Sequence, residues 1–121
     1  MKDGGILDAI VAKEIKRIKN LIIKVVAPEA IYLFGSYANG TPSNDSDVDI
    51  YVIIPDSNET QIEIMKKIGN AILKKQIMPV DIVVGFNSEF QKRKNLPTLE
   101  RKIFREGVLL YGQDEYFKRV V

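Results

Sequence analysis

The stretch LFGSYANGTPSNDSDVDIYVII, residues Leu33–Ile54, ends in an apolar run that begins with two aspartates, Asp47 and Asp49. Side chains alternate along a strand, so these two aspartates share a face with Tyr51, and their Cα atoms lie about 6.6–6.8 Å apart. Two carboxylates on one face of a buried strand are costly unless a cation lies between them. We therefore expect this strand to bind a cation through its first residues.

The composition narrows the chemistry that such a cation site can perform. The chain contains no His and no Cys, which excludes imidazole-assisted serine catalysis, thiolate nucleophiles and the usual zinc ligands. Two carboxylates at strand spacing suit a pair of divalent ions roughly 3.5–4 Å apart, as in two-metal phosphoryl-transfer sites. Oxygen ligands favour two Mg²⁺ ions, with Mn²⁺ as the other candidate. The plainer alternative is that Asp47 only ends the loop and Asp49 forms a salt bridge.

Two other motifs in the same stretch fail on their spacing. DSDVDI, from Asp45, imitates the start of an EF-hand loop, but Ile50 stands where the loop needs Gly and Asp56 where it needs Glu. GSYANGT, from Gly35, imitates a Walker A loop, but Thr41 stands where the phosphate-binding Lys belongs.

Three further residues are candidates for the same site. Gly35 and Ser36 follow a predicted strand, and a glycine that allows close backbone approach, with Ser36 capping a short helical turn, can form an anion site. A simple turn is the alternative. Asp81 lies inside the apolar segment PVDIVVG. On a strand beside Asp49 it would complete the coordination of the catalytic metal or take the proton of an attacking hydroxyl, whereas at a strand edge it would only be solvated.

The whole chain, residues 1–121, is predicted to form a single domain of the α/β (α+β) class, with a small mixed sheet flanked by helices. The expected order is a helix over 6–26, strands over 30–34 and 47–54, a helix over 59–75, a strand over 79–85, a helix from 97 to 107 and a strand over 108–111. Ser57 or Asn58 is the expected cap of the second helix, and residues 88–95 are expected to be a mobile basic stretch. The buried stripe of the second helix is predicted to be Ile62, Met65, Ile68, Ile72 and Leu73.

Charge and hydropathy predict a cytoplasmic protein. Of the 121 residues, 45% are hydrophobic and 28% charged, and the net charge of +2 is too small to indicate direct nucleic-acid binding. No apolar run approaches the roughly 20 residues that span a bilayer, and the first residues lack the apolar block of a secretory signal. Apolar faces on the terminal helices could support a homo-oligomer.

The candidate residues together resemble the signature of the DNA polymerase beta nucleotidyltransferase superfamily. That signature is Gly-Ser, a loop, Asp-hydrophobic-Asp-hydrophobic, and a further Asp on a later strand. The matching residues here are Gly35-Ser36, Asp47-Val48-Asp49-Ile50 and Asp81. The chain is most similar to the minimal nucleotidyltransferase (MNT) group, small prokaryotic proteins that end soon after a segment like IFREGVLLYG. The resemblance implies a polymerase-beta-like fold over almost the whole chain.

The resemblance also implies a reaction. Gly35 and Ser36 would hold the β- and γ-phosphates of a nucleoside triphosphate, with ATP expected, while Asp47 and Asp49 would bind both Mg²⁺ ions and Asp81 the catalytic one. An acceptor hydroxyl would attack the α-phosphorus in line and release pyrophosphate. Minimal members are often encoded beside a helical partner of the HEPN class, some pairs acting as toxin and antitoxin, and can transfer AMP to a Tyr of that partner. We therefore expect a protein adenylyltransferase with an antitoxin role and a HEPN-type partner.

Two questions stay open at the level of sequence. Larger members of the superfamily carry a second domain that binds the acceptor or the base, and this chain shows none. A non-catalytic binding module that neutralises or scaffolds a helical partner by contact is therefore the alternative. The basic residues are either solvated surface or include one or two that reach the triphosphate or an acidic partner. These residues are Lys92, Arg93, Lys94, Arg101, Lys102 and Arg105.

Overall fold

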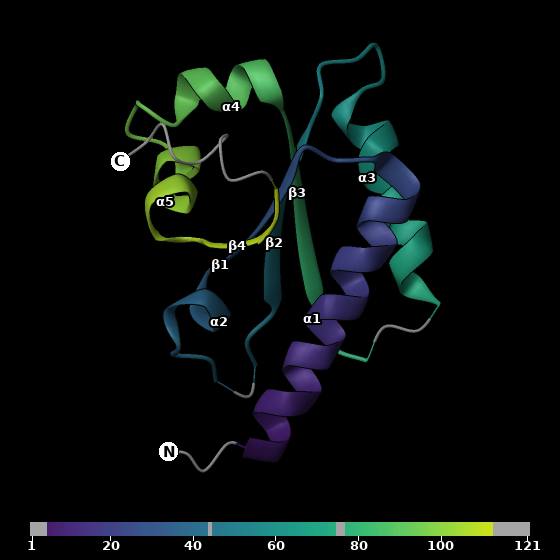
Figure 1. The fold of residues 1–121 in the computed structure, drawn as a ribbon, viewed down its shortest axis with the longest axis vertical. Coiled ribbons are helices and arrows are strands. Elements are labelled where there is room, and N and C mark those ends of the chain that lie inside the picture. Colours follow the sequence, from purple (N-terminus) through teal and green to yellow (C-terminus); the bar gives the residue numbers. More distant parts are fainter. Residues whose placement is uncertain (1–4, 44, 75–76, 113–121) are drawn as a thin grey trace.

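A computed structural model describes residues 5–43, 45–74 and 77–112 of the chain (Figure 1). In chain order the elements are α1 (Gly5–Val26), β1 (Ala30–Phe34), α2 (Ser36–Asn39), β2 (Val48–Ile54), α3 (Gln61–Leu73), β3 (Val80–Phe86), α4 (Asn87–Arg93), α5 (Leu99–Glu106) and β4 (Val108–Tyr111). The first helix and all four strands lie where the sequence predicts them, within a residue or so at each end.

The four strands form one mixed sheet in the order β3-β2-β1-β4. Strand β1 runs antiparallel to β2 and to β4, whereas β2 and β3 run parallel, joined by the crossover helix α3. The prediction of a small mixed sheet flanked by helices is confirmed.

Helices cover both faces of the sheet, and strand alternation decides which side chains meet which helices. One face packs against α1 and α3, and the other against α4 and α5 (Figure 1). The first core contains Ile18, Ile22, Ile31, Leu33, Val48, Ile50, Val52, Ile54, Ile64, Ile68, Ile72 and Val84. The second, smaller core contains Ala30, Tyr32, Tyr51, Ile53, Phe90 and Ile103. The odd-numbered residues of β2, which include Asp49, therefore face the α4 and α5 side.

Helix α3 begins later than predicted, and its buried stripe is different. Thr60, rather than Ser57 or Asn58, is the N-cap, because its hydroxyl accepts the Glu63 N–H while the Glu63 carboxylate accepts the Thr60 N–H. This reciprocal cap sets where the first turn of the helix begins.

The stripe that α3 buries consists of Ile64, Ile68 and Ile72, spaced by four residues along one side of the helix. The predicted stripe was wrong at Ile62, Met65 and Leu73, which are 65%, 40% and 71% exposed, and it missed Ile64. Several apolar residues surround this helix, so periodicity alone did not separate the buried side from the exposed one.

The stretch predicted to be mobile, residues 88–95, instead begins as helix α4. Phe90 is fully buried, and its ring lies 5.5 Å from that of Tyr51, 6.3 Å from that of Tyr32 and 6.1 Å from that of Phe104, measured between centroids. One aromatic anchor therefore orders a segment whose other residues are mostly polar or charged.

In the described residues no helix is both long and apolar enough to cross a membrane.

Candidate active site

The motif residues gather at one end of the sheet because of the strand directions. β1 ends at Phe34 with Gly35 next, and β2 and β3 begin at this same end, beside α2 (Figure 1). Asp49 and Asp81 are each the second residue of their strand and are direct register partners. Asp47 immediately precedes β2. The prediction that Asp81 lies on a strand adjacent to that of Asp49 is confirmed.

The carboxylates of Asp47 and Asp81 act electrostatically on that of Asp49. The pKa of Asp49 is raised above its ordinary value, first by burial and then by the nearby carboxylates of Asp81 and Asp47. Asp49 is half-buried, whereas Asp47 and Asp81 are exposed. Burial and like charge both disfavour the ionised form of Asp49, and a divalent cation among the three groups would remove that penalty.

The carboxylates of Asp47, Asp49 and Asp81 suit a hard divalent cation in their chemistry, although their side chains are not close enough together to form a coordination shell. Within the described ranges no three acidic side chains lie close enough to form a ready-made metal site. The three carboxylates nonetheless supply only oxygen donors, and the raised pKa of Asp49 reflects the negative charge gathered around it. Oxygen donors of this kind are those that Mg²⁺ and Mn²⁺ prefer.

Gly35 packs its backbone directly against the Asp49 carboxylate. Its φ of 78° and ψ of −157° belong to a region that only glycine occupies without strain. A Cβ at this position would lie 2.2 Å from Oδ2 of Asp49. Glycine is therefore required here both by conformation and by contact.

Ser36 takes a different place from the predicted one. Gly35 is the N-cap of α2 and makes no side-chain capping bond, and Ser36 is the first helical residue. The Gly35 carbonyl accepts hydrogen bonds from the N–H groups of Ala38 and Asn39, at 3.1 and 3.0 Å. The expectation that Ser36 caps this turn was wrong by one residue, because only glycine can adopt the backbone conformation at the start of the turn.

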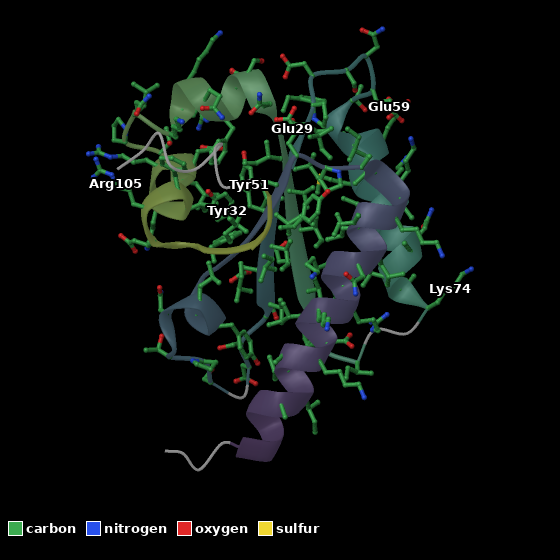
Figure 2. The ribbon with its side chains drawn as sticks, in the orientation of Figure 1. Glu29, Tyr32, Tyr51, Glu59, Lys74 and Arg105 are labelled. Atoms are coloured by element: carbon green, nitrogen blue, oxygen red, sulfur yellow. The ribbon has the colours of Figure 1, made fainter. Side chains whose placement is uncertain are left out.

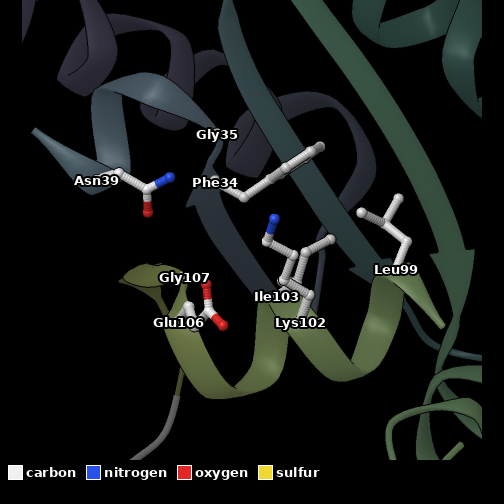
Figure 3. Close-up of a pocket in the computed structure, with 8 residues that line it drawn as sticks. All are labelled: Phe34, Gly35, Asn39, Leu99, Lys102, Ile103, Glu106 and Gly107. Carbon is white, nitrogen blue, oxygen red and sulfur yellow. The ribbon is translucent and has the colours of Figure 1, made fainter. Parts of the chain in front are cut away.

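A pocket of about 240 Å³ opens beyond Gly35, between the end of β1, α2 and α5 (Figure 3). Phe34 and Gly35 form one wall, and Asn39, Lys102 and Glu106 supply its polar groups. Asp47, Asp49 and Asp81 do not line it, but Gly35 does, and the Gly35 backbone also abuts the Asp49 carboxylate.

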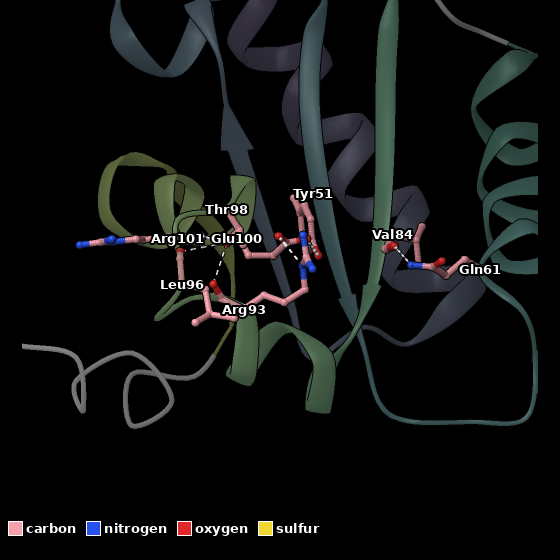
Figure 4. A network of polar contacts seen from close by, with 8 residues as sticks. All are labelled: Tyr51, Gln61, Val84, Arg93, Leu96, Thr98, Glu100 and Arg101. Carbon is pink, nitrogen blue, oxygen red and sulfur yellow. Dashed lines mark hydrogen bonds and ion pairs between the residues drawn. The ribbon is translucent and has the colours of Figure 1, made fainter.

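A polar network fixes the helices on this face of the sheet (Figure 4). The Tyr51 hydroxyl donates to Oε2 of Glu100 and Nε of Arg93 donates to Oε1, each at 3.0 Å. Burial alone would raise the pKa of Glu100, but these hydrogen bonds from Arg93 and Tyr51 hold it below its ordinary value. The network joins β2, α4 and α5 two residues from Asp49.

Gly85, on β3, makes room for this network. A Cβ on Gly85 would lie 2.1 Å from the Tyr51 hydroxyl oxygen. Sequence reasoning did not identify the network or the pocket, because Glu100 and Lys102 are distant in the chain from the motif. The one available signal was that Tyr51 shares a face with Asp49.

A family model described as "Polymerase beta, Nucleotidyltransferase" matches residues 16–116. The chain belongs to this nucleotidyltransferase family. The match covers all of the motif residues, from Gly35 to Asp81.

One relative of known activity agrees with the nucleotidyltransferase assignment. The protein adenylyltransferase MntA of Shewanella oneidensis is 39% identical over 61 residues, which cover 49% of this chain and 44% of MntA. The match thus spans less than half of that relative. It confirms the predicted similarity to the minimal nucleotidyltransferases.

Two solved structures resemble this fold. A suggested nucleotidyltransferase from Sulfolobus solfataricus is 20% identical with a TM-score of 0.66, covering 95% of this chain and 93% of its own, and it supports the fold alone. A toxin-antitoxin structure with AMP-PNP is 28% identical with a TM-score of 0.54, covering 88% of this chain and 78% of its own.

Proposed function

We propose that this nucleotidyltransferase uses Mg²⁺ to transfer AMP from ATP to a hydroxyl group of a helical HEPN-type partner protein, as the antitoxin of a toxin-antitoxin pair. Membership of the family supports the reaction class. The similarity to a protein named a protein adenylyltransferase, and to a toxin-antitoxin structure with AMP-PNP, supports an adenine nucleotide and a protein partner in a toxin-antitoxin pair. The observation that carries the proposal is the register pairing of Asp49 with Asp81 beside the backbone of Gly35.

In this proposal the three aspartates act on the metal ions, and Asp81 also accepts a proton. Asp47 and Asp49 would hold two Mg²⁺ ions, or Mn²⁺, and Asp81 would hold the catalytic ion. The ions, when bound, supply stabilisation of the charge on the attacking and leaving oxygens. Gly35 and Ser36 hold the β- and γ-phosphates through the turn that follows β1.

The transfer itself is an in-line substitution at the α-phosphorus. The acceptor oxygen forms a bond to the α-phosphorus, and the bond from that phosphorus to the oxygen bridging to the β-phosphate breaks. Pyrophosphate leaves with the electron pair, and the acceptor proton passes to Asp81 and from there to solvent. The reaction needs no imidazole base, which agrees with a chain that has no His.

The test is transfer of label from ATP carrying ³²P at the α-position to a helical HEPN-type protein, the proposed partner. With Mg²⁺ present, the wild-type protein should label its partner. Asp49→Asn and Asp81→Asn should each lower the labelling rate by about a hundredfold or more, because each removes a charged ligand of the ions. Asp45→Asn is the matched control, since Asp45 is an exposed acid in the loop before β2, outside the candidate set.

A measurement of thermal unfolding separates loss of activity from loss of folding. Asn at position 49 removes a carboxylate whose ionised form is disfavoured in the fold, so without metal the variant should unfold at a temperature no lower than the wild type. That result would show that lost labelling is not lost folding. Equal labelling by wild type and Asp49→Asn would contradict the assignment, and a stable complex without any labelling would favour the non-catalytic binding module.

A further inference from the structure

One face of helix α5 lines the pocket beyond Gly35. Leu99, Lys102, Ile103 and Glu106 are spaced as i, i+3, i+4 and i+7, so they lie along one side of the helix. Ile103 is buried and anchors this side of α5 against the sheet. Figure 3 shows the Lys102 amine directed into the pocket toward the end of β1.

Unlike Arg93 and Lys94, the Lys102 side chain has no ion pair or hydrogen bond with the described part of the chain, and unlike Arg101 and Arg105 it lines this pocket. Arg93 is held by Glu100, and the Lys94 amine lies 4.5 Å from the centre of the Phe104 ring. Glu106, one turn further along α5, also lines the pocket but makes no ion pair with Lys102. An ammonium group without a protein partner, aimed into a pocket, is a candidate for binding an anion.

The position of the pocket indicates which anion it would receive. Gly35 joins the two regions, since its backbone abuts the Asp49 carboxylate and also lines the pocket. A triphosphate that follows the turn at Gly35, with its α-phosphate at the carboxylates, would bring its terminal phosphates to the Lys102 side. The hydrogen bonds of Glu100 with Tyr51 and Arg93 hold α5 against the sheet and so fix where Lys102 lies.

We propose that Lys102 binds the terminal phosphates of the nucleoside triphosphate, the part that leaves as pyrophosphate. This inference rests on the proposed nucleotidyl transfer. The Lys102 ammonium donates hydrogen bonds to non-bridging oxygens of the β- and γ-phosphates, where negative charge increases as the bond to the α-phosphorus breaks. AMP, which lacks these phosphates, makes no use of Lys102.

The experiment is calorimetric titration of ATP, pyrophosphate and AMP, each with Mg²⁺, into wild type and Lys102→Gln. We expect the substitution to weaken ATP and pyrophosphate by roughly ten- to a hundredfold, the range of a charge-assisted hydrogen bond. Binding of AMP should change by less than about twofold, and Lys102→Arg should recover most of the affinity for ATP. Arg105→Gln is the matched control, because it removes the same charge from the same helix but lies outside this pocket and points away from the sheet (Figure 2).

The outcomes separate this inference from the function on which it rests. If wild type transfers AMP and Lys102→Gln binds ATP as tightly as wild type, Lys102 is not a phosphate ligand, while the proposed function stands. If Lys102→Gln weakens AMP as much as ATP, the pocket holds the nucleoside and the inference also fails. If wild type binds neither ATP nor pyrophosphate with Mg²⁺, the proposed function and the inference fail together.

Discussion

Gly35 is the residue on which the geometry of the candidate site most depends. Gly35 and Gly40, at the two ends of α2, both have a positive φ, 78° and 77°, so alanine is strained at either. Their surroundings differ. A Cβ on Gly40 would meet nothing within 4 Å, whereas a Cβ on Gly35 would collide with the Asp49 carboxylate. Alanine substitutions at Gly35 and Gly40 therefore distinguish the effect of backbone strain, present at both positions, from the effect of a collision with Asp49, present only at Gly35.

We expect Gly40→Ala to lower the free energy of unfolding by about 1–2 kcal/mol and to leave binding of Mg²⁺ and ATP unchanged. Gly35→Ala should lower it by about 1–3 kcal/mol more, because the turn or Asp49 must move, and should weaken nucleotide binding at least about tenfold. Urea unfolding and calorimetric titration measure the two quantities. Identical losses of stability and affinity in both variants would show that the contact between Gly35 and Asp49 has no role.

At the scale of single elements, α4 depends on one side chain. Phe90 is the buried residue of this helix, and it contacts aromatic rings from β1, β2 and α5. We expect Phe90→Ala to lower the free energy of unfolding by about 3–4 kcal/mol, the cost of removing a buried aromatic ring. Phe104→Ala should cost less, because Phe104 is only half-buried.

Amide hydrogen exchange distinguishes a local effect of Phe90→Ala from a global one. Loss of protection should be greatest in residues 87–93 and in α5, since the same aromatic cluster holds both helices. Unchanged protection in α4 would show that contacts other than the Phe90 ring order this segment.

Prediction from the sequence succeeded where local pattern and burial agree. The strands AIYLF and VLLY are short apolar runs bounded by Pro or Gly, and both lie where they were predicted. The prediction that Asp81 lies on a strand next to that of Asp49 is also confirmed, since the two are register partners. Prediction failed at α4 and at the stripe of α3, where packing against partners distant in the chain decides which side is buried. Lys102 was one of six basic residues that sequence alone could not rank, since its place depends on how α5 packs.

At the scale of the whole molecule, the face of the sheet opposite the candidate site carries a buried charge. Glu14, on α1, is 4% exposed and accepts two hydrogen bonds from Arg17, at 2.8 and 2.6 Å. Its carboxylate also accepts the Ile77 N–H, at 3.5 Å, and so links α1 to the segment before β3. The hydrogen bonds from Arg17 lower the pKa of Glu14, although burial opposes them.

The lowered pKa of Glu14 makes the stability of the fold depend on pH in a definite direction. A carboxyl whose pKa is lower in the folded than in the unfolded chain stabilises the fold at neutral pH, and this contribution disappears as the pH falls from the ordinary Glu value through the folded one. We expect Glu14→Gln to lower the free energy of unfolding by about 1–2 kcal/mol at pH 7 and to flatten its decline below about pH 4.3. The control is Glu59→Gln, at an exposed ion pair with Lys67, which should change the free energy of unfolding by less than about 1 kcal/mol. Urea unfolding from pH 3 to pH 7 measures both variants, and equal pH profiles for wild type and Glu14→Gln would show that the acid sensitivity of this fold arises elsewhere. Because Glu14 lies on the α1 side of the sheet, its substitution should leave binding of Mg²⁺ and ATP unchanged. Glu14→Gln therefore separates the stability of the fold from the chemistry of the opposite face.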